Sequence, residues 1–360
     1  MPKRLAVSWA AAAILAAAGL AACSSSGQSS SASSSGADLG PITYAGSGGS
    51  AGAVIQKEIN KFTAQTGIKV NYVQGTTSVN YAKVVAQKAH PSVDVLEINP
   101  SDLVKGAAQG LFDKINAQEV PAITDLYPQT PASDYGVPQH IAVEGFAYNS
   151  AKFAAAGIPP LTKTSDIFNP KLKGHVAMFP PNGNFGIDAL VLLAKANGGS
   201  ASNVAPGFAA LKKLKDDGNW TLTPQAPADG DAEMANGTAW VEYTSSTHAN
   251  TVAAQGAPVV FVSPTDTGGV SEISDLAAVA NTGHEQASLK LINFLLSPEA
   301  QESQASAFVG PVNAKAELSG STAKGVPYGE SVLKSLYVLD QTTIAKNKAQ
   351  WIQEWNQQLG

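Results

Sequence analysis

Short apolar segments alternate with amphipathic ones after residue 40. Segments 42–44, 68–73 and 93–98 have the apolar or alternating composition of buried strands. Each is followed by a polar or glycine-rich turn and then by apolar residues at helical spacing, and Thr66-Gly67 ends the first of these helices. Three strand–turn–helix units in succession predict a parallel sheet with helices on its faces.

Residues 134–150 lack the apolar spacing of a helix and are predicted to be extended, which is typical of a crossover between two lobes. Beyond it, strands and helices alternate again. We expect strands at 174–179, 238–243, 257–263 and 272–280, and helices at 187–196, 208–215 and 287–296. Ser297-Pro298-Glu299 has the cap, first-turn proline and first-turn acid that begin a further helix. The roughly 320 residues after residue 40 are enough for two lobes rather than a single core.

The N-terminus has the pattern of an export signal. Lys3 and Arg4 precede an apolar run that is mostly alanine, so residues 1–22 are predicted to be a signal peptide. The run ends in Leu20-Ala21-Ala22-Cys23, which resembles the bacterial lipobox and implies a diacylglycerol on Cys23. Cys23 is the only cysteine and therefore has no disulfide partner. Residues 23–40 are rich in serine and are expected to be a flexible tether.

Composition narrows the class of partner. The chain has 23 basic and 28 acidic residues, and removal of Lys3 and Arg4 makes the exported protein more acidic still. A mildly acidic surface without basic clusters argues against nucleic-acid binding. No second membrane segment follows Cys23 in the sequence.

The loop after the first strand fits two enzyme motifs. Residues 46–51 match the G-x-G-x-x-A dinucleotide pattern, and 48–52 match the G-x-S-x-G nucleophile elbow. The first needs an acid after the second strand, where Gln74-Gly75 stands instead. The second needs a histidine beside Ser50, and the sequence places none there. What remains is a helix N-terminus, with Ser47 or Ser50 either capping the helix or contacting a ligand.

Several acids and rings are candidates for binding a cationic group. Convergent carboxylates would hold an ammonium or guanidinium group, and aromatic rings would cover it. Polar residues that follow the first two strands are expected at the same edge of the sheet. The candidate ligand-binding residues are Ser47, Gly48, Thr77, Ser78, Glu97, Glu144, Phe185, Glu242, Tyr243 and Glu272. His140 and His248 also lie near the expected cleft. No His or Cys pair has the spacing of metal ligands, so neither a metal nor another cofactor is expected.

Six segments together resemble the bacterial extracellular solute-binding proteins of ABC importers, in the branch of the spermidine/putrescine binders and their ferric-iron relatives. The matching segments are 62–84, 110–115, 135–153, 166–181, 287–301 and 310–317. The resemblance implies a two-lobed α/β fold of the type II periplasmic-binding-protein kind, in which each lobe has a central sheet flanked by helices. It also implies a ligand cleft between the lobes, no catalysis, and a permease and an ATPase on other chains as partners. We expect a monomer that is anchored by lipid to the outer face of the cytoplasmic membrane.

The lobe boundaries follow from the same resemblance. Lobe 1 is expected at 41–137 plus about 266–308, and lobe 2 at 138–265 plus about 309–360. The favoured ligand is a polyamine or another amine-bearing solute, with a small carboxylate as the alternative. Polyamine binders carry an aromatic-x-Asp element before the returning strand, whereas this chain has Glu272-Ile273-Ser274 followed by Asp275. A secreted hydrolase using Ser50 and a surface lipoprotein without a transport role are the hypotheses from other classes.

Overall fold

The structure is a computed structural model that describes residues 39–320 and 322–360. Its strands are β1 (Ile42–Gly46), β2 (Val70–Gln74), β3 (Val95–Ile98), β4 (Val137–Asn149), β5 (Val176–Ala177), β6 (Trp220–Leu222), β7 (Val241–Ser245), β8 (Val259–Val262) and β9 (Val270–Ala278). Its α-helices are α1 (Gly49–Thr66), α2 (Thr77–Ala86), α3 (Pro100–Ala108), α4 (Ser150–Ala156), α5 (Asn184–Ala196), α6 (Ala205–Asp216), α7 (Pro227–Asn236), α8 (Ser246–Ala254), α9 (Glu285–Leu295), α10 (Pro298–Gln304), α11 (Glu330–Lys334) and α12 (Gln341–Gln358). Short 3₁₀ helices are η1 (Pro121–Asp125), η2 (Thr164–Phe168), η3 (Pro170–Leu172) and η4 (Ala305–Ala307).

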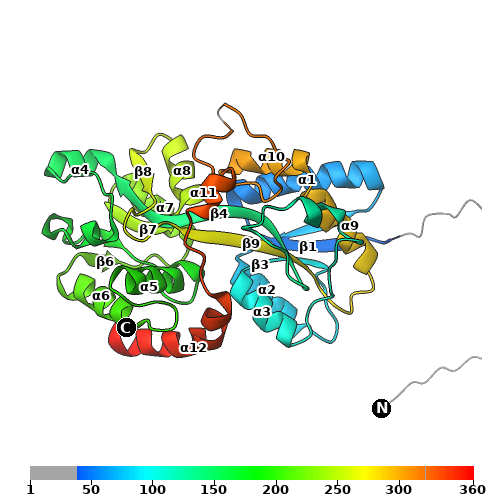
Figure 1. Cartoon of the computed structure of the whole chain (residues 1–360), viewed down its shortest axis with the longest axis horizontal. Coiled ribbons are helices and arrows are strands. Elements are labelled where there is room, and N and C mark those ends of the chain that lie inside the picture. Colours follow the sequence, from blue (N-terminus) through cyan, green and yellow to red (C-terminus); the bar gives the residue numbers. More distant parts are fainter. Residues whose placement is uncertain (1–38, 321) are drawn as a thin grey trace, which may run out of the picture. The chain divides into compact units, whose positions relative to one another are not determined.

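The strands pair in the order β2-β1-β3-β9-β4-β7-β5-β6, and β8 pairs with β4 (Figure 1). At one end β1 runs parallel to both β2 and β3, and at the other β5 runs parallel to β6 and β7. The two long strands β4 and β9 are antiparallel and join these ends. We call the β1–β2–β3 end with its helices lobe 1, and the β5–β6–β7 end with its helices lobe 2.

Lobe 1 has an apolar core on each face of its sheet because alternate strand residues point to opposite faces. Tyr44 and Val95 pack in a cluster that includes residues of α1 and α9. Their neighbours Ala45 and Leu96 pack in a second cluster, with residues of α2 and α3. The parallel sheet covered by helices that the sequence predicted is therefore confirmed for β1, β2 and β3.

Lobe 2 is built in the same way. Tyr243 of β7 packs with Phe146 of β4 in a large cluster that includes α5, α6 and α12. The other face carries a smaller cluster around Ala147 and Met234, with residues of α7 and α8. Figure 1 shows α5, α6 and α12 on one side of this end of the sheet and α7 and α8 on the other.

Several helix ends match the expected signals, and others do not. Gly67 adopts φ 77° at the end of α1, and Ser297 accepts a hydrogen bond from the backbone N–H of Ala300 at the start of α10. The expectation that Ser47 or Ser50 caps α1 was wrong, because its N-cap is Gly48 and no side chain bonds there. Thr76, rather than Thr77 or Ser78, caps α2 by accepting from Val79 N–H.

The sequence pattern missed some elements that the structure contains. The short helices α4, α7 and α8 lack a long apolar stripe. The C-terminal helix α12 is polar on most positions and buries Ile344, Lys348, Trp351 and Trp355 on one face. The strand expected at 174–179 is reduced to the two residues of β5. The periodicity of apolar residues is weak in a helix that buries only a narrow part of its surface, so the sequence pattern does not reveal it.

The N-terminal predictions fall largely outside the described residues. The signal peptide, Cys23 and most of the tether lie there, and only Leu39 and Gly40 of the tether are described. Among the residues that are described, no helix combines the length and apolar character needed to span a bilayer. The lobe boundaries stay a prediction. Val312 and Leu333 pack in the lobe 1 cluster, whereas Ile344 of α12 packs in that of lobe 2.

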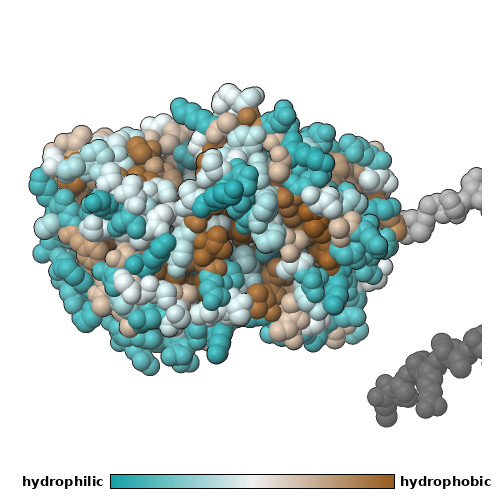
Figure 2. Space-filling model, viewed as in Figure 1, coloured by the Kyte–Doolittle hydropathy of each residue, from teal (hydrophilic) through white to brown (hydrophobic). Residues whose placement is uncertain are grey.

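The surface in Figure 2 is mostly hydrophilic, with hydrophobic residues gathered toward the middle of this face, between the two lobes. Single exposed valines occur elsewhere, including Val79, Val104 and Val338. Scattered exposed apolar side chains are normal for a folded protein.

We predict that Asp275 makes stability depend on pH. Burial raises the pKa of this β9 carboxyl from 3.8 to about 7, so the folded protein holds a proton there that the unfolded chain releases. Stability is therefore lost as pH rises between those values. Since one pKa unit corresponds to about 1.4 kcal/mol, the stability of Asp275→Asn relative to the wild type should increase by up to about 4 kcal/mol between pH 4 and pH 8.

Urea unfolding at several pH values checks this prediction. Asp216→Asn is the control, because Asp216 is exposed and pairs with Lys212 at the surface. A stability difference between Asp275→Asn and the wild type that is the same at every pH would contradict it.

Candidate functional site

Two small cavities with acidic residues in their lining lie beside β4 and β9. The first, which we call the Glu97 cavity, is lined by Ser47, Ala51, Val54, Ile55, Glu97, His140, Gln304, Ala307 and Val309. The second, which we call the Lys348 cavity, is lined by Pro100, Ser101, Asn184, Ile187, Asp188, Ser271, Glu272, Ile273, Gln341, Ile344 and Lys348. Each has a volume of about 10 Å³, room for about one water molecule. Neither cavity is large enough for an organic solute.

Glu97 at the end of β3 is the centre of the first cavity and is only 2% exposed. The backbone N–H of Ser47 donates to its Oε2 at 2.8 Å, and the Ser47 hydroxyl donates to its Oε1 at 2.6 Å. The Tyr44 hydroxyl lies 3.2 Å from Oε2. Charge-assisted bonds from three donors stabilise the carboxylate in this buried place. The glycine-rich turn is thus held by an acid of the protein itself.

Gly46 is required at this turn for packing reasons. A Cβ on Gly46 would lie 2.4 Å from the Tyr44 ring and 2.7 Å from Glu97 Oε2. The Tyr72 hydroxyl also donates to the carbonyl oxygen of Ser47. Burial and the neighbouring Glu97 charge raise the pKa of both Tyr44 and Tyr72, so both tyrosines remain donors.

His140 enters the same cavity from β4, next to an irregularity in the pairing with β9. Between Pro138 and His140 the register shifts by one residue, and the extra residue is the fully buried Gln139. Such a bulge re-aims the side chains that follow it. Burial lowers the pKa of His140, although the Glu97 charge opposes the shift. His140 is therefore a neutral imidazole at the pH of most environments.

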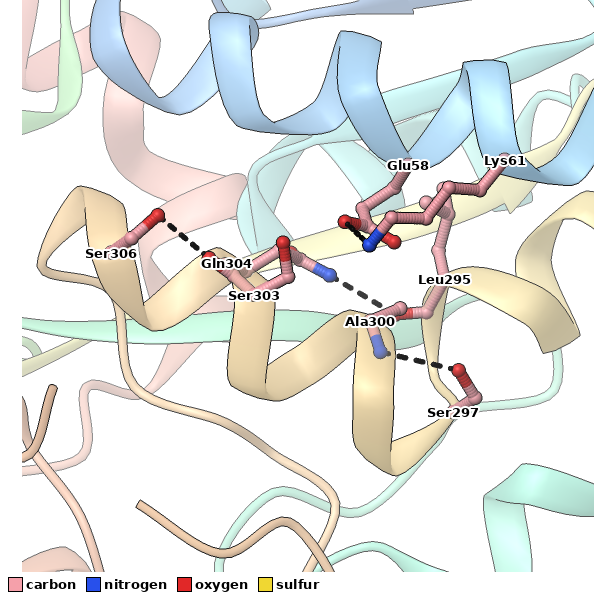
Figure 3. A network of polar contacts seen from close by, with 8 residues as sticks. All are labelled: Glu58, Lys61, Leu295, Ser297, Ala300, Ser303, Gln304 and Ser306. Carbon is pink, nitrogen blue, oxygen red and sulfur yellow. Dashed lines mark hydrogen bonds and ion pairs between the residues drawn. The ribbon is translucent and has the colours of Figure 1, made fainter. Parts of the chain in front are cut away.

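The bulge is held in place from α10. Gln301 Nε2 donates to the Gln139 carbonyl oxygen at 2.7 Å, and Gln304 Nε2 donates to the Leu295 carbonyl at 3.1 Å. Figure 3 shows Gln304 beside Leu295, and the buried Glu58 of α1 paired with Lys61 nearby. The bonds of Gln301 and Gln304 link α9, α10 and β4, and α10 and β4 form part of the wall of the Glu97 cavity.

On the lobe 2 side, Glu144 and Asp188 form a buried carboxyl pair. Glu144 of β4 is 0% exposed, and its Oε2 accepts from the Tyr243 hydroxyl at 2.9 Å. Burial raises the pKa of Glu144, and the neighbouring Asp188 charge raises it further. Burial also raises the pKa of Asp188, while the Lys348 charge opposes that shift. Negative charge on both carboxyls at once is therefore disfavoured.

Glu272 of β9 lies between the two cavities. It lines the Lys348 cavity. Burial is the main cause that raises the pKa of Glu272, and the charge of Glu97 in the other cavity raises it further. The Ser245 side chain bonds to its carboxylate, but Oε2 is buried and has no hydrogen-bond partner among the described residues. An unpaired buried carboxylate oxygen is costly unless a donor reaches it.

His248 faces Glu272 from the first turn of α8. Its Nδ1 lies 2.9 Å from Asp231 Oδ2. Burial lowers the pKa of His248, but the Asp231 bond and the Asp231 and Glu272 charges outweigh burial, and the net pKa is raised. The ring of Phe185 packs edge-on against His248 with centroids 5.9 Å apart.

The structure brings only part of the predicted set together. Ser47, Glu97 and Glu272 line the cavities, and Gly48 begins α1 beside Ser47. The other predicted residues do not line them. Glu144 and Tyr243 lie beneath the site and bond to each other, and Phe185 belongs to the lobe 2 core.

Three further predicted residues lie away from the cavities. Thr77 accepts a hydrogen bond from Asn99 Nδ2 at 2.8 Å, and Ser78 is half-buried on α2. Glu242 and Tyr243 point to opposite faces of the sheet because they are adjacent strand residues, so the structure does not bring these two candidates together. Its carboxylate lies against Gly230 of α7, where a Cβ would come within 2.6 Å of Oε1.

Sequence reasoning missed Asp188, Lys348, Asn184 and Ser101, which line the Lys348 cavity. An acid within the otherwise apolar segment 187–194 is a signal for Asp188. A lysine at helical spacing between Ile344 and Trp351 is the corresponding signal for Lys348. Ser101 and Asn184 carry no such pattern, because their place depends on how α3 and α5 meet across the cleft.

The loop carries no catalytic arrangement. Ser50 is exposed in the first turn of α1, and none of the described histidines contacts it. The Ser47 hydroxyl bonds to a carboxylate rather than to an imidazole. Among the described residues, no group of three or more His, Cys, Asp or Glu side chains is arranged to hold a metal ion.

Comparison with known proteins places the chain in a family. The model of the family described as bacterial extracellular solute-binding protein matches residues 57–327, well over half of the chain. The chain belongs to this family. This solute-binding protein therefore functions by binding rather than by catalysis, as the sequence predicted, and the nucleophile-elbow reading of Ser50 is wrong.

Individual relatives are distant. Iron uptake protein A1 of Synechocystis sp. is 24% identical over 247 residues, 67% of each chain. The spermidine/putrescine-binding periplasmic protein of Salmonella typhimurium is 26% identical over 322 residues, 84% of this chain and 83% of the relative. A crystal structure of an ABC transporter from Clostridium perfringens superposes with a TM-score of 0.74 at 21% identity, covering 89% of this chain and 100% of that one. The predicted type II periplasmic-binding-protein fold is confirmed.

We predict that Ser47 stabilises the turn through Glu97. Ser47→Ala removes the 2.6 Å bond to a buried carboxylate and should lower the free energy of unfolding by about 2 kcal/mol. Ser50→Ala is the matched control three residues away, and because Ser50 is exposed its effect should stay within about 0.5 kcal/mol. Chemical denaturation of both variants measures the difference, and equal stabilities would show that the Ser47 bond contributes nothing.

Proposed function

We propose that this solute-binding protein captures a small amine-bearing polar solute and delivers it to the permease and ATPase of an ABC importer. The observation that carries the ligand class is the buried Glu272 Oε2, which has no hydrogen-bond partner among the described residues. A carboxylate oxygen only accepts hydrogen bonds, and an ammonium group supplies donors together with the opposite charge.

The charges around Glu272 favour a cation. Glu97, Asp188 and Glu272 line the cavities, and Glu144 lies directly beneath them. The basic residues near these acids are Lys348, His248 and the neutral His140. Where the pKa of an acid is raised at this site, burial and the neighbouring negative charges make its ionised form less stable. An incoming ammonium group stabilises the ionised form, and this gain is available as binding energy.

The fold supports capture by closure of the two lobes. Ser47, Glu97 and Ser101 come from lobe 1, Asn184 and Asp188 from lobe 2, and Glu272 from the strand that connects them. A solute that touches both sides stabilises the form in which the lobes are closed around it. The permease would then distinguish loaded from empty protein by the separation of the lobes.

The similarity to a spermidine/putrescine-binding protein supports an amine as ligand, while the local residues argue against a long polyamine. The aromatic expected before the returning strand is absent, and the cleft rings Phe185 and Tyr243 are packed in the core of lobe 2. A solute with a single ammonium group near Glu272 fits this arrangement better. A small carboxylate alone would leave the unpaired Glu272 Oε2 without a donor.

We further propose that Cys23 carries the lipid that holds the protein at the outer face of the cytoplasmic membrane. The lipobox pattern of residues 20–23 and the serine-rich segment after it support this assignment. Two or more acyl chains give stable membrane attachment. The folded part begins near Ile42, so the tether would leave the cleft free to open.

We predict that Glu272 is required for affinity. In a thermal-shift screen, amines should raise the melting temperature, because a ligand at one hundred times its Kd adds about 2.7 kcal/mol of apparent stability. For the best amine, Glu272→Gln should weaken binding by about tenfold or more, since it removes a charged hydrogen-bond partner worth about 1.5–3 kcal/mol. Glu285→Gln, at an exposed acid of α9, should leave Kd unchanged. A shift produced only by anions would refute the amine assignment.

We predict that Cys23→Ser releases the protein from the membrane. In the native host the wild-type protein should sediment with membranes and incorporate labelled fatty acid, because the thiol is the acceptor of the lipid. The variant should be soluble and unlabelled while it keeps the same affinity for solute, since residue 23 precedes the folded part. Membrane sedimentation of the Cys23→Ser protein would show that another feature anchors it.

A further inference from the structure

The Lys348 cavity contains a buried cation that nothing in the protein neutralises by direct contact. Lys348 of α12 is 7% exposed and lines the cavity. The described residues include no carboxylate oxygen within 4.0 Å of its ammonium nitrogen, although six lysine–carboxylate pairs within that distance occur elsewhere among them. Buried lysines are almost always paired, so this one is poised to meet an acidic group.

Other groups around Lys348 are also suited to an acid. The first turns of α3 and α5 reach the cavity from opposite lobes through Ser101 and Asn184. The backbone N–H groups of a first helical turn lack partners within the helix, and the helix dipole favours negative charge there. Neither α3 nor α5 has a side chain that caps its N-terminus. A lysine and two helix N-termini therefore converge on one small space.

The same cavity is adjacent to the acids of the proposed amine site. Glu272 lines it, and the charge of Glu97 reaches Glu272 from the other cavity. The Lys348 cavity therefore holds one cationic side chain together with two acidic ones, Asp188 and Glu272, while Glu97 lies in the other cavity. A solute that carries both an ammonium and an acid group offers one partner to Glu272 and another to Lys348.

We propose that the Lys348 cavity binds the acid group of a zwitterionic solute, whose ammonium group lies at Glu272. This inference rests on the proposed amine-binding function and narrows its ligand to amino acids and related amino-acid-like acids. Lys348 is then the residue that distinguishes such a solute from a diamine, because a second ammonium group in its place would meet a like charge in a buried site.

The position of α12 explains why closure and acid recognition are linked. The helix packs in the lobe 2 core through Ile344, Trp351 and Trp355, and it also packs against α3 of lobe 1. Lys348 therefore meets the first turn of α3 only when the lobes are together. An acid group between them bonds to both, so it stabilises the closed form in addition to filling the site.

The test is calorimetric titration of the full folded protein with three matched series of probes. These are α,ω-diamines, ω-amino acids and α,ω-dicarboxylates, compared at each methylene chain length. The best ω-amino acid should bind at least tenfold more tightly than the diamine and the dicarboxylate of the same length. Lys348→Met should weaken binding of that amino acid by tenfold or more and leave the diamine unchanged or improved. Lys346→Met, at an exposed lysine on the same helix, should behave as the wild type.

The outcomes separate this inference from the proposed function. If the wild type prefers a diamine over every ω-amino acid, the amine function stands and the zwitterion inference is wrong. It is also wrong if Lys348→Met weakens amino acid and diamine equally, since that is the signature of a purely structural lysine. If no amine-bearing probe binds, the proposed function fails, and this inference fails with it. The wild-type preference decides the matter even if Lys348→Met does not fold, and Lys348→Gln provides a second variant.

Discussion

The antiparallel pairing of β4 with β9 is the constraint on which the rest of the structure depends. These strands run from Val137↔Leu276 to Glu144↔Val270, and they belong to the sheets of both lobes. Their backbone hydrogen bonds join the two ends of the sheet. Glu272 and His140 stand on these two strands, so the candidate site is attached to the connection itself. Under the proposed closure mechanism, movement of the lobes would change the surroundings of both residues.

Buried negative charge is the second organising feature, and the protein treats its acids in different ways. Donors from Ser47 and Tyr44 satisfy Glu97, whereas Glu144 and Glu272 each keep a buried oxygen without a hydrogen-bond partner among the described residues. Glu97 thereby holds the turn after β1, and Glu272 is the acid with an unpaired oxygen that lines a cavity. The distinction follows from hydrogen bonding and position rather than from the identity of the residue.

Lys348 and Glu272 place opposite charges on the wall of one cavity, beside Asp188. Among the described residues, no carboxylate oxygen lies within ion-pair distance of the Lys348 ammonium group. The cavities beside them are each about the size of a water molecule. A solute between the lobes that carried both charges would form direct ion pairs with Glu272 and with Lys348. Such a site gains specificity from charge placement more than from apolar area.

The sequence by itself determined the family, the strand–helix units of lobe 1, and the place of Glu97 and Ser47 at the ends of strands. Those features rest on local periodicity and on turn residues, which act over a few positions. Only the tertiary structure decided that Glu242 and Tyr243 face apart, that Thr76 rather than Thr77 caps α2, and that Lys348 of the last helix enters the cleft. Lys348 and Asp188 are 160 residues apart in the chain. Their meeting depends on how α12 packs against α3 and α6, and local periodicity does not encode packing between distant elements.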